Sequence, residues 1–137
     1  MRFVFDGDMA LWIEFFERGV ESARDPAVNR EVAERLVGIT RRNIVEHGVN
    51  RDWPELAEAT VLARLRHQLG GTAPLVRTGT LLRSIEPGTG PDYAEAGTDL
   101  GYAVHQFELR DPFGLRPGDE TDIEELLADR LFGAGGL

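Results

Sequence analysis

The sequence predicts an α+β fold, in which a small antiparallel β-sheet is flanked by helices, with long N-terminal helices and a C-terminal helix. Apolar residues recur every three or four positions over about residues 26–46 and again after Thr121, which is the period of an amphipathic helix. β-favouring runs at Arg2–Phe5 and Tyr93–Thr98 are short and lie next to turn-forming residues. Helices and short strands therefore share one chain, which predicts a single domain over residues 1–137.

The composition is that of a globular protein with an acidic surface. The chain has 137 residues, of which 42% are apolar and 28% charged, and its net charge is −9. This charge argues against a broad basic surface for duplex DNA or anionic membranes. The absence of cysteine excludes disulfides and thiolate metal sites. The N-terminus lacks signal-peptide character, and no apolar run approaches the roughly 20 residues that cross a bilayer.

The N-terminal part predicts a brief strand followed by two helices. Arg2–Phe5 forms the strand, and Asp8 caps a first helix whose apolar face is formed by Trp12, Phe15, Phe16, Val20 and Ala23. This face is either part of the core or an exposed contact between subunits. The second helix begins at Asp25-Pro26, runs to about residue 46, and stops at His47-Gly48.

A polar loop ending at Trp53 leads into a short helix that stops at Gly70-Gly71. Its expected apolar side is Ala57, Val61, Leu62, Leu65 and Leu69. Arg64, Arg66 and His67 form a small basic cluster on the same segment. The cluster is either a solvated helix face or a contact with an acidic partner, such as another copy of this acidic chain.

The central stretch, from Leu75 to Phe107, predicts a turn of helix and a short hairpin. Thr78 or Thr80 can cap a single turn over Leu81–Ser84, and Gly79 eases the bend. Several Gly and Pro residues interrupt the hairpin that follows, before the strand at Tyr93–Thr98. Residues 102–107 are expected to form a short helix or an irregular segment packed on the sheet.

The C-terminal part predicts an arm, a helix and a frayed tail. Pro and Gly make residues 110–118 an edge or arm, and Arg116 is our candidate for reaching a neighbouring subunit. The pattern Thr121-x-x-Glu124 predicts a capping box at the start of the last helix. Residues 133–137 are expected to be a flexible tail.

Catalytic and cofactor-binding patterns are weak. The three histidines, His47, His67 and His105, lack the spacing of a metal site. Ser84 could be combined with His105 and an aspartate, but it lacks the G-x-S-x-G elbow of a nucleophile. No phosphate-binding glycine loop is present. The sequence predicts neither an enzyme nor a cofactor. Every cationic side chain is arginine, which favours bidentate pairing with carboxylates, and such pairs are expected between subunits.

Short motifs follow one another in a characteristic order from Trp53 onward. They are W-x-x-L with a basic helix, T-G-x-L-x-x-S-I, G-T, Y-A-x-x-H-Q-F and P-F-G-L before an acidic helix. The residues that carry them are Trp53, Leu56, Thr60, Arg64, Arg66, Thr78, Gly79, Leu81, Ser84, Ile85, Gly97, Thr98, Tyr102, His105, Gln106, Phe107 and Phe113. In this order the chain resembles the phage virion morphogenesis family, the tail-completion proteins of tailed phages and Mu-like prophages.

Three positions depart from that family's pattern. Ala57 stands where the family often has a helix-capping Ser, which should weaken the helix start by roughly 1 kcal/mol. Glu108 replaces a Gly, Asp111 replaces an Arg, and the hairpin between Ile85 and Ala94 is unusually short for the family. These departures concern the local geometry of the hairpin and of the arm.

The resemblance implies a structural protein of the phage neck or tail end, assembled in the host cytoplasm into the virion. It implies a homo-oligomeric ring, six- or twelve-fold, that contacts other neck, tail tube, sheath or connector proteins. DNA would pass through the lumen without sequence-specific binding, and no membrane is involved. The alternatives are a tail-terminator or head-closure ring protein of the same particle, or a small cytoplasmic dimeric binding module that uses Trp12, Phe15 and Phe16.

Overall fold

An antiparallel sheet covered by one long helix forms the centre of the computed structural model, which describes residues 2–6, 10–14, 25–66, 79–90, 93–100, 106–107 and 109–132. The sheet contains β1 (Arg2–Asp6), β2 (Ala10–Glu14), β4 (Tyr93–Gly97) and β3 (Glu86–Thr89), in that spatial order. Every neighbouring pair is antiparallel. The expected α+β class, with a small antiparallel sheet and a C-terminal helix, is therefore confirmed.

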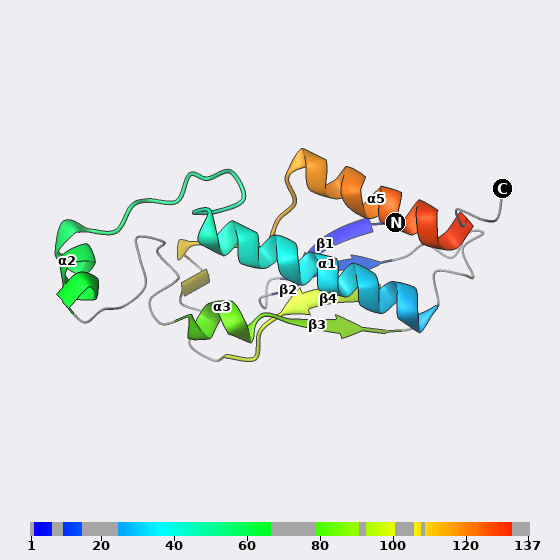
Figure 1. Ribbon diagram of the computed structural model, residues 1–137, viewed down its shortest axis with the longest axis horizontal. Helices are drawn as coiled ribbons and strands as arrows, with labels where there is room; N and C mark the ends of the chain where they lie inside the picture. Colours follow the sequence, from blue (N-terminus) through cyan, green and yellow to red (C-terminus); the bar gives the residue numbers. More distant parts are fainter. Residues whose placement is uncertain are drawn as a thin grey trace.

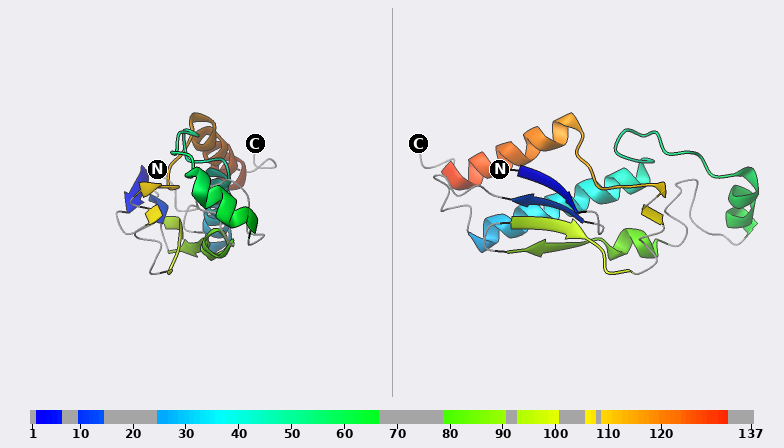
Figure 2. Two further views of the ribbon diagram at one scale, coloured as in Figure 1. Left: turned by 90° about the vertical axis from the view of Figure 1, so that its left-hand side faces the viewer. Right: turned by 180° about the vertical axis from the view of Figure 1, so that it is seen from behind.

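The helix α1 (Pro26–Val45) lies across the sheet, and α5 (Pro117–Phe132) packs alongside α1 (Figure 1). The two views in Figure 2 show the same arrangement of sheet and helices. The short helix α3 (Thr80–Ser84) precedes β3, whereas α2 (Glu58–Arg66) lies at one end of the molecule, apart from the sheet. Within the described ranges, no helix combines the length and apolar character needed to cross a membrane.

The prediction of a first N-terminal helix is wrong over residues 10–14, because these residues form the strand β2. Trp12 lies in this strand, paired in register with Val4 of β1 and Glu95 of β4. The backbone of β2 pairs with a strand on each side. This pairing outweighs the helical spacing of the aromatic residues, because the tendency to form a strand depends strongly on the neighbouring strands. The brief strand at Arg2–Phe5 is confirmed as β1. The other members of the expected helix face, Phe15, Phe16, Val20 and Ala23, lie outside the described residues.

The helix α1 follows the sequence prediction closely. The Asp25 side chain accepts a hydrogen bond from the Ala27 N–H at 2.9 Å, and Pro26 occupies the first turn. At the other end the Gly48 N–H donates to the Asn43 carbonyl at 2.7 Å, with Gly48 at a φ of 110°. The buried residues of the helix are Val28, Asn29, Val32, Ala33, Leu36, Val37, Ile39, Thr40, Asn43 and Ile44.

Small residues on β4 allow α1 to lie against the sheet. Ala94 and Ala96 are fully buried and alternate with half-buried neighbours along the strand. The short hairpin and the strand at residues 93–97 confirm the expectation for this stretch. The cap of α3 differs from the prediction, because Gly79 in the left-handed conformation holds the N-cap position and Thr80 is already inside the helix. Thr78 lies outside the described residues.

The C-terminal helix begins earlier than the capping box at Thr121 predicts. Pro117 is its first residue, and the carboxylate of Asp119 accepts a hydrogen bond from the Arg116 N–H at 2.8 Å. The Asp119 carboxylate, two residues after the first helical proline, thus satisfies the backbone N–H of the residue before the helix, as the acidic residue of a capping box does. Thr121 lies in the second turn, where its Oγ1 is 3.5 Å from the Pro117 carbonyl oxygen. The tail 133–137 lies outside the described residues.

Substituting two glycines should have opposite effects on stability. Gly48→Ala places a Cβ in a positive-φ position and 2.7 Å from the Trp53 indole nitrogen, so the free energy of unfolding should fall by about 2 kcal/mol. Gly38→Ala, in the exposed middle of α1 with nothing within 4 Å, should raise it by about 1 kcal/mol. Urea denaturation of both variants measures the difference, and equal effects would contradict the assigned turn.

Candidate functional site

The segment from Gly79 to Thr98 joins two of the sequence motifs through a single pair of hydroxyls. Ser84 Oγ lies 2.7 Å from Thr98 Oγ1 and also donates to the Leu81 carbonyl at 2.6 Å. Thr98 Oγ1 in turn accepts from the Leu100 N–H at 3.2 Å. The hydroxyls therefore connect the end of α3 with the chain leaving β4, and each motif fixes the other.

Apolar residues of the same motif anchor this segment in the core. Leu81 is 6% exposed and Ile85 is fully buried. Arg41 of α1 donates to the Ile85 carbonyl at 2.9 Å, so the chain between α3 and β3 is held from both sides. Gly97 ends β4 opposite Ala10 of β2 and Glu86 of β3. The described residues of the motif thus hold the shape of the chain.

Aromatic motif residues pack at the C-terminal end of α1. Trp53 is half-buried against Gly48, and its backbone N–H donates to the His47 carbonyl at 3.0 Å. Phe107 and Phe113 are both buried, and their rings meet edge to face with centroids 5.2 Å apart. Gln106 is exposed at the start of this segment. The motifs around residues 53, 107 and 113 therefore converge on the end of α1.

Arg116 does not reach out to a neighbour as predicted. Its guanidinium donates to the carbonyl oxygens of Val49 at 2.6 Å and Gly48 at 3.0 Å, and it pairs with Glu46 at 2.9 Å. These acceptors are the C-cap carboxylate of α1 and two carbonyls of the turn that follows it, close to the helix C-terminus, where a cation is favourable. The arm is therefore bound within its own chain, and the prediction for Arg116 is wrong.

A polar cluster next to Arg116 fastens α1 to the arm and to α5. Arg42 and Asp119 form a two-pronged ion pair, with N–O distances of 2.6 and 2.7 Å. Asn43 is fully buried and donates to the carbonyls of Pro112 at 2.9 Å and Gly114 at 3.0 Å. It also accepts a hydrogen bond from Arg42 at 2.8 Å. The three side chains thus form one connected network.

Sequence reasoning missed this cluster, although a signal was present. Asn29, Thr40 and Asn43 are polar residues that fall on the buried side of a helix whose other inward positions are apolar. The Thr40 hydroxyl donates to the Leu36 carbonyl of its own helix at 2.9 Å. The two asparagines bind other segments instead, and Asn29 donates to the Gly90 carbonyl at 3.0 Å. A buried polar residue must find partners, and here the partners are distant stretches of backbone.

The ion pair shifts the pKa values of its members in the directions that favour charge. Burial alone would raise the pKa of Asp119, but its hydrogen bonds with Arg42 and the Arg116 N–H outweigh burial and lower the pKa below its usual value. The hydrogen bond to Asp119 raises the pKa of Arg42. Hydrogen bonding by Arg116 likewise lowers the pKa of Glu46. Burial raises the pKa of Asp111, partly offset by its bond from the Phe113 N–H.

The short helix α2 presents a different surface. Arg64 is only 7% exposed, which contradicts a solvated helix face at this residue, whereas its intersubunit role stays a prediction. Leu62 and Leu65 of the expected apolar side are 51% and 68% exposed, so this side of the helix lies outside the core. Arg66 and Thr60 are also exposed. The helix therefore turns leucines and a cation outward.

The remaining predicted residues have mixed outcomes. Leu56 is half-buried before α2, and the carbonyl of Ala57 accepts the first hydrogen bonds of that helix, with no side-chain cap. Four further residues, Phe15, Phe16, Tyr102 and His105, lie outside the described residues, as do His67, Leu69 and the stop at Gly70-Gly71. Among the described residues, no three His, Asp or Glu side chains are grouped so as to hold a metal ion.

Comparison with protein-family models, with curated proteins and with solved structures gave no match to this chain.

Removing the charge of Asp119 should change how the free energy of unfolding depends on pH. Asp119→Asn should lower the free energy of unfolding at pH 7 by about 2 kcal/mol, because Arg42 then lacks its anion. The folded-state pKa of Asp119 is lowered, so its stabilisation is present above about pH 4 and is lost as the pH falls through the folded value. Denaturation at pH 7 and pH 3 should show the two proteins converging at low pH.

Asp122→Asn provides the matched control, since Asp122 pairs with Arg35 between the same two helices but is 54% exposed. Its effect should be small at both pH values. An equal loss in the two variants would contradict a special role for the Asp119 pair.

Asn43→Ala should destabilise the fold by about 3 kcal/mol, because the buried carbonyls of Pro112 and Gly114 lose their donor. Asn50→Ala, at an exposed position just after α1, serves as the control. Thermal unfolding of both variants measures the effect, and equal melting temperatures would contradict this account of Asn43.

Proposed function

We propose that this chain is a structural subunit of a phage neck or tail end, which completes the tail and helps to join it to the head. The ordered series of motifs from Trp53 to the acidic C-terminal helix carries the proposal. The hydrogen bond between Ser84 and Thr98 supports it, because it gives two of these motifs a role in holding the subunit's shape.

The described surface is compatible with an assembly role in a second respect. The leucines of α2 are exposed at one end of the molecule, whereas most other large apolar side chains of the described residues lie in the core around α1. Leu62 and Leu65 are neighbours on one helix face, and apolar side chains that are grouped on a surface, rather than scattered singly, mark contact with other proteins. In this proposal they contribute to contacts within the particle.

The proposed assembly is a homo-oligomeric ring, six- or twelve-fold, through whose lumen DNA passes. With a net charge of −9, such a ring can present carboxylates to the passing DNA and repel its backbone. A tail-terminator or head-closure ring of the same particle is the variant of this proposal closest to it. A neutral or basic lumen in an assembled ring would count against the proposed charge effect.

Loss of the gene tests the role directly. In the phage or prophage that encodes the chain, its deletion should leave filled heads and separate tails that do not join, and the intact gene supplied in trans should restore whole particles. Electron microscopy and plaque counts measure both outcomes. Normal particles without the protein would overturn the proposal.

Light scattering on the purified chain separates the proposal from a small binding module. A stable dimer at all concentrations, together with normal particles in the deletion, favours the module. Incorporation of the labelled protein at the head–tail joint favours the neck role.

A further inference from the structure

The outward face of α2 exposes apolar side chains that make no contribution to the core. Leu62 and Leu65 are three residues apart and so lie on one side of the helix, and Arg66 follows directly. Within the described part of the chain, Arg66 makes no ion pair or hydrogen bond. A nine-residue helix gains little stability by itself, so an exposed apolar side is a feature that contact with a partner would stabilise.

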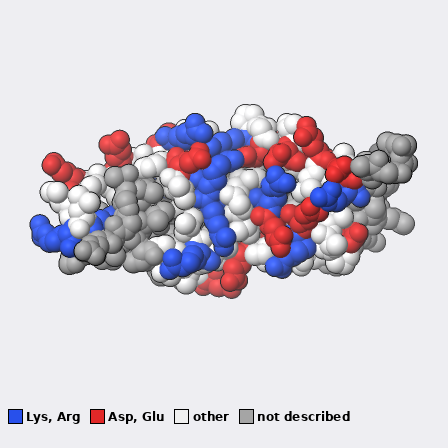
Figure 3. Space-filling view, viewed as in Figure 1, with Lys and Arg blue, Asp and Glu red and all other residues white. Residues whose placement is uncertain are grey.

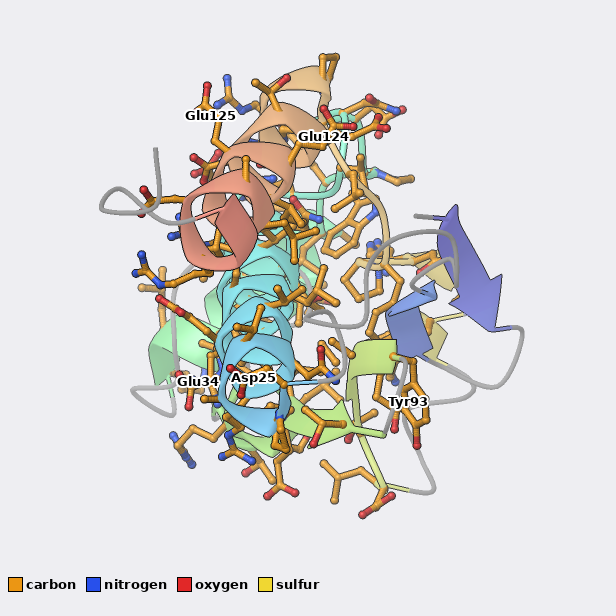
Figure 4. All side chains as sticks on the ribbon, turned by 90° about the vertical axis from the view of Figure 1, so that its right-hand side faces the viewer. Asp25, Glu34, Tyr93, Glu124 and Glu125 are labelled. Carbon is orange, nitrogen blue, oxygen red and sulfur yellow. The ribbon has the colours of Figure 1, made fainter. Side chains whose placement is uncertain are left out.

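The outer face of α5 is complementary to α2 in charge and in shape. Glu124 and Glu125 lie on the outer side of α5 (Figure 4), and both are exposed and without an ion pair among the described residues. With Thr121 and Ala128, which are also exposed, they occupy positions i, i+3, i+4 and i+7. Four side chains in this arrangement surround a hollow on the helix surface that accepts a side chain of another helix.

Several other charges on α1 and α5 are already paired within the chain. Figure 3 shows positive and negative side chains interspersed over α1 and α5. Arg130 holds Glu31 through two bonds of 2.8 Å, and Arg35 holds Asp122 at 2.8 Å. Glu124 and Glu125 are therefore carboxylates to which a cation from another molecule has access.

We infer that α2 of one copy docks on α5 of a second copy, with Leu65 seated between Thr121 and Ala128 and Arg66 paired with Glu124 or Glu125. The two surfaces differ, so the contact is heterologous, and repetition of it generates a ring or a filament. The inference deepens the proposed function, on which it rests, by naming the surfaces through which adjacent subunits meet.

Cysteine crosslinking tests the contact cleanly, because the natural chain has no cysteine. Chains carrying Leu65→Cys and chains carrying Ala128→Cys, mixed under mild oxidation, should form covalent dimers, whereas each variant alone should not. A disulfide requires the two Cα atoms to approach within about 7 Å, so the product reports a specific contact. Leu65→Cys mixed with Leu109→Cys is the control, since Leu109 is 77% exposed and lies outside both surfaces.

Charge exchange tests the ion pair. Arg66→Glu in the Leu65→Cys chain should reduce the yield of dimer about tenfold. Glu124→Arg with Glu125→Arg in the Ala128→Cys chain should restore it. All these positions are exposed, and circular dichroism verifies that each variant is folded.

Several outcomes would overturn the inference. They are equal crosslinking in the Leu109 control, dimers of Leu65→Cys with itself, and no crosslink in the mixed chains. If the last occurs while the deletion still separates heads from tails, another surface joins the subunits and the proposed function stands. If crosslinks form but the deletion leaves particles normal, self-association is retained and the neck role fails.

Discussion

Two buried asparagine side chains fix α1 to the chain around it, and the rest of the structure depends on that attachment. Asn29 holds the turn of the β3–β4 hairpin through the Gly90 carbonyl, and Asn43 holds the arm through the carbonyls of Pro112 and Gly114. The apolar stripe of α1 would pack on a sheet in more than one position, because apolar contact is not directional. Hydrogen bonds from buried amides select a single position.

The end of α1 shows how that attachment is reinforced by charge. The turn after α1 presents the carbonyls of Gly48 and Val49, and the arm returns to the same place carrying Arg116, which binds both. Asp119 then receives both the Arg116 N–H and the Arg42 guanidinium, so the start of α5 is defined by the end of α1. The arm is thereby held in place despite its irregular backbone, and the start of α5 is bound to the C-terminal end of α1.

The sequence was a good guide to local structure wherever one signal dominated. Asp25-Pro26 and His47-Gly48 mark both ends of α1, and turn residues mark the β3–β4 hairpin. It failed at residues 10–14, because the spacing of Trp12 fits a helix and only the pairing with β1 and β4 makes the segment a strand. It failed again at α5, where the partner of Asp119 lies on a helix far away in sequence.

The candidate site was less accessible to sequence reasoning, since burial decides which arginines are available. Arginine-only cations predicted pairing with carboxylates between subunits, yet Arg42, Arg116 and Arg130 are engaged within the chain. Nothing in their local sequence distinguishes them from Arg66, and even neighbouring Arg64 is buried on the same short helix. Exposure and the lack of a partner within the described chain are properties of the folded molecule. They single out Arg66, with the leucines beside it, as the part of the basic helix left to meet another surface.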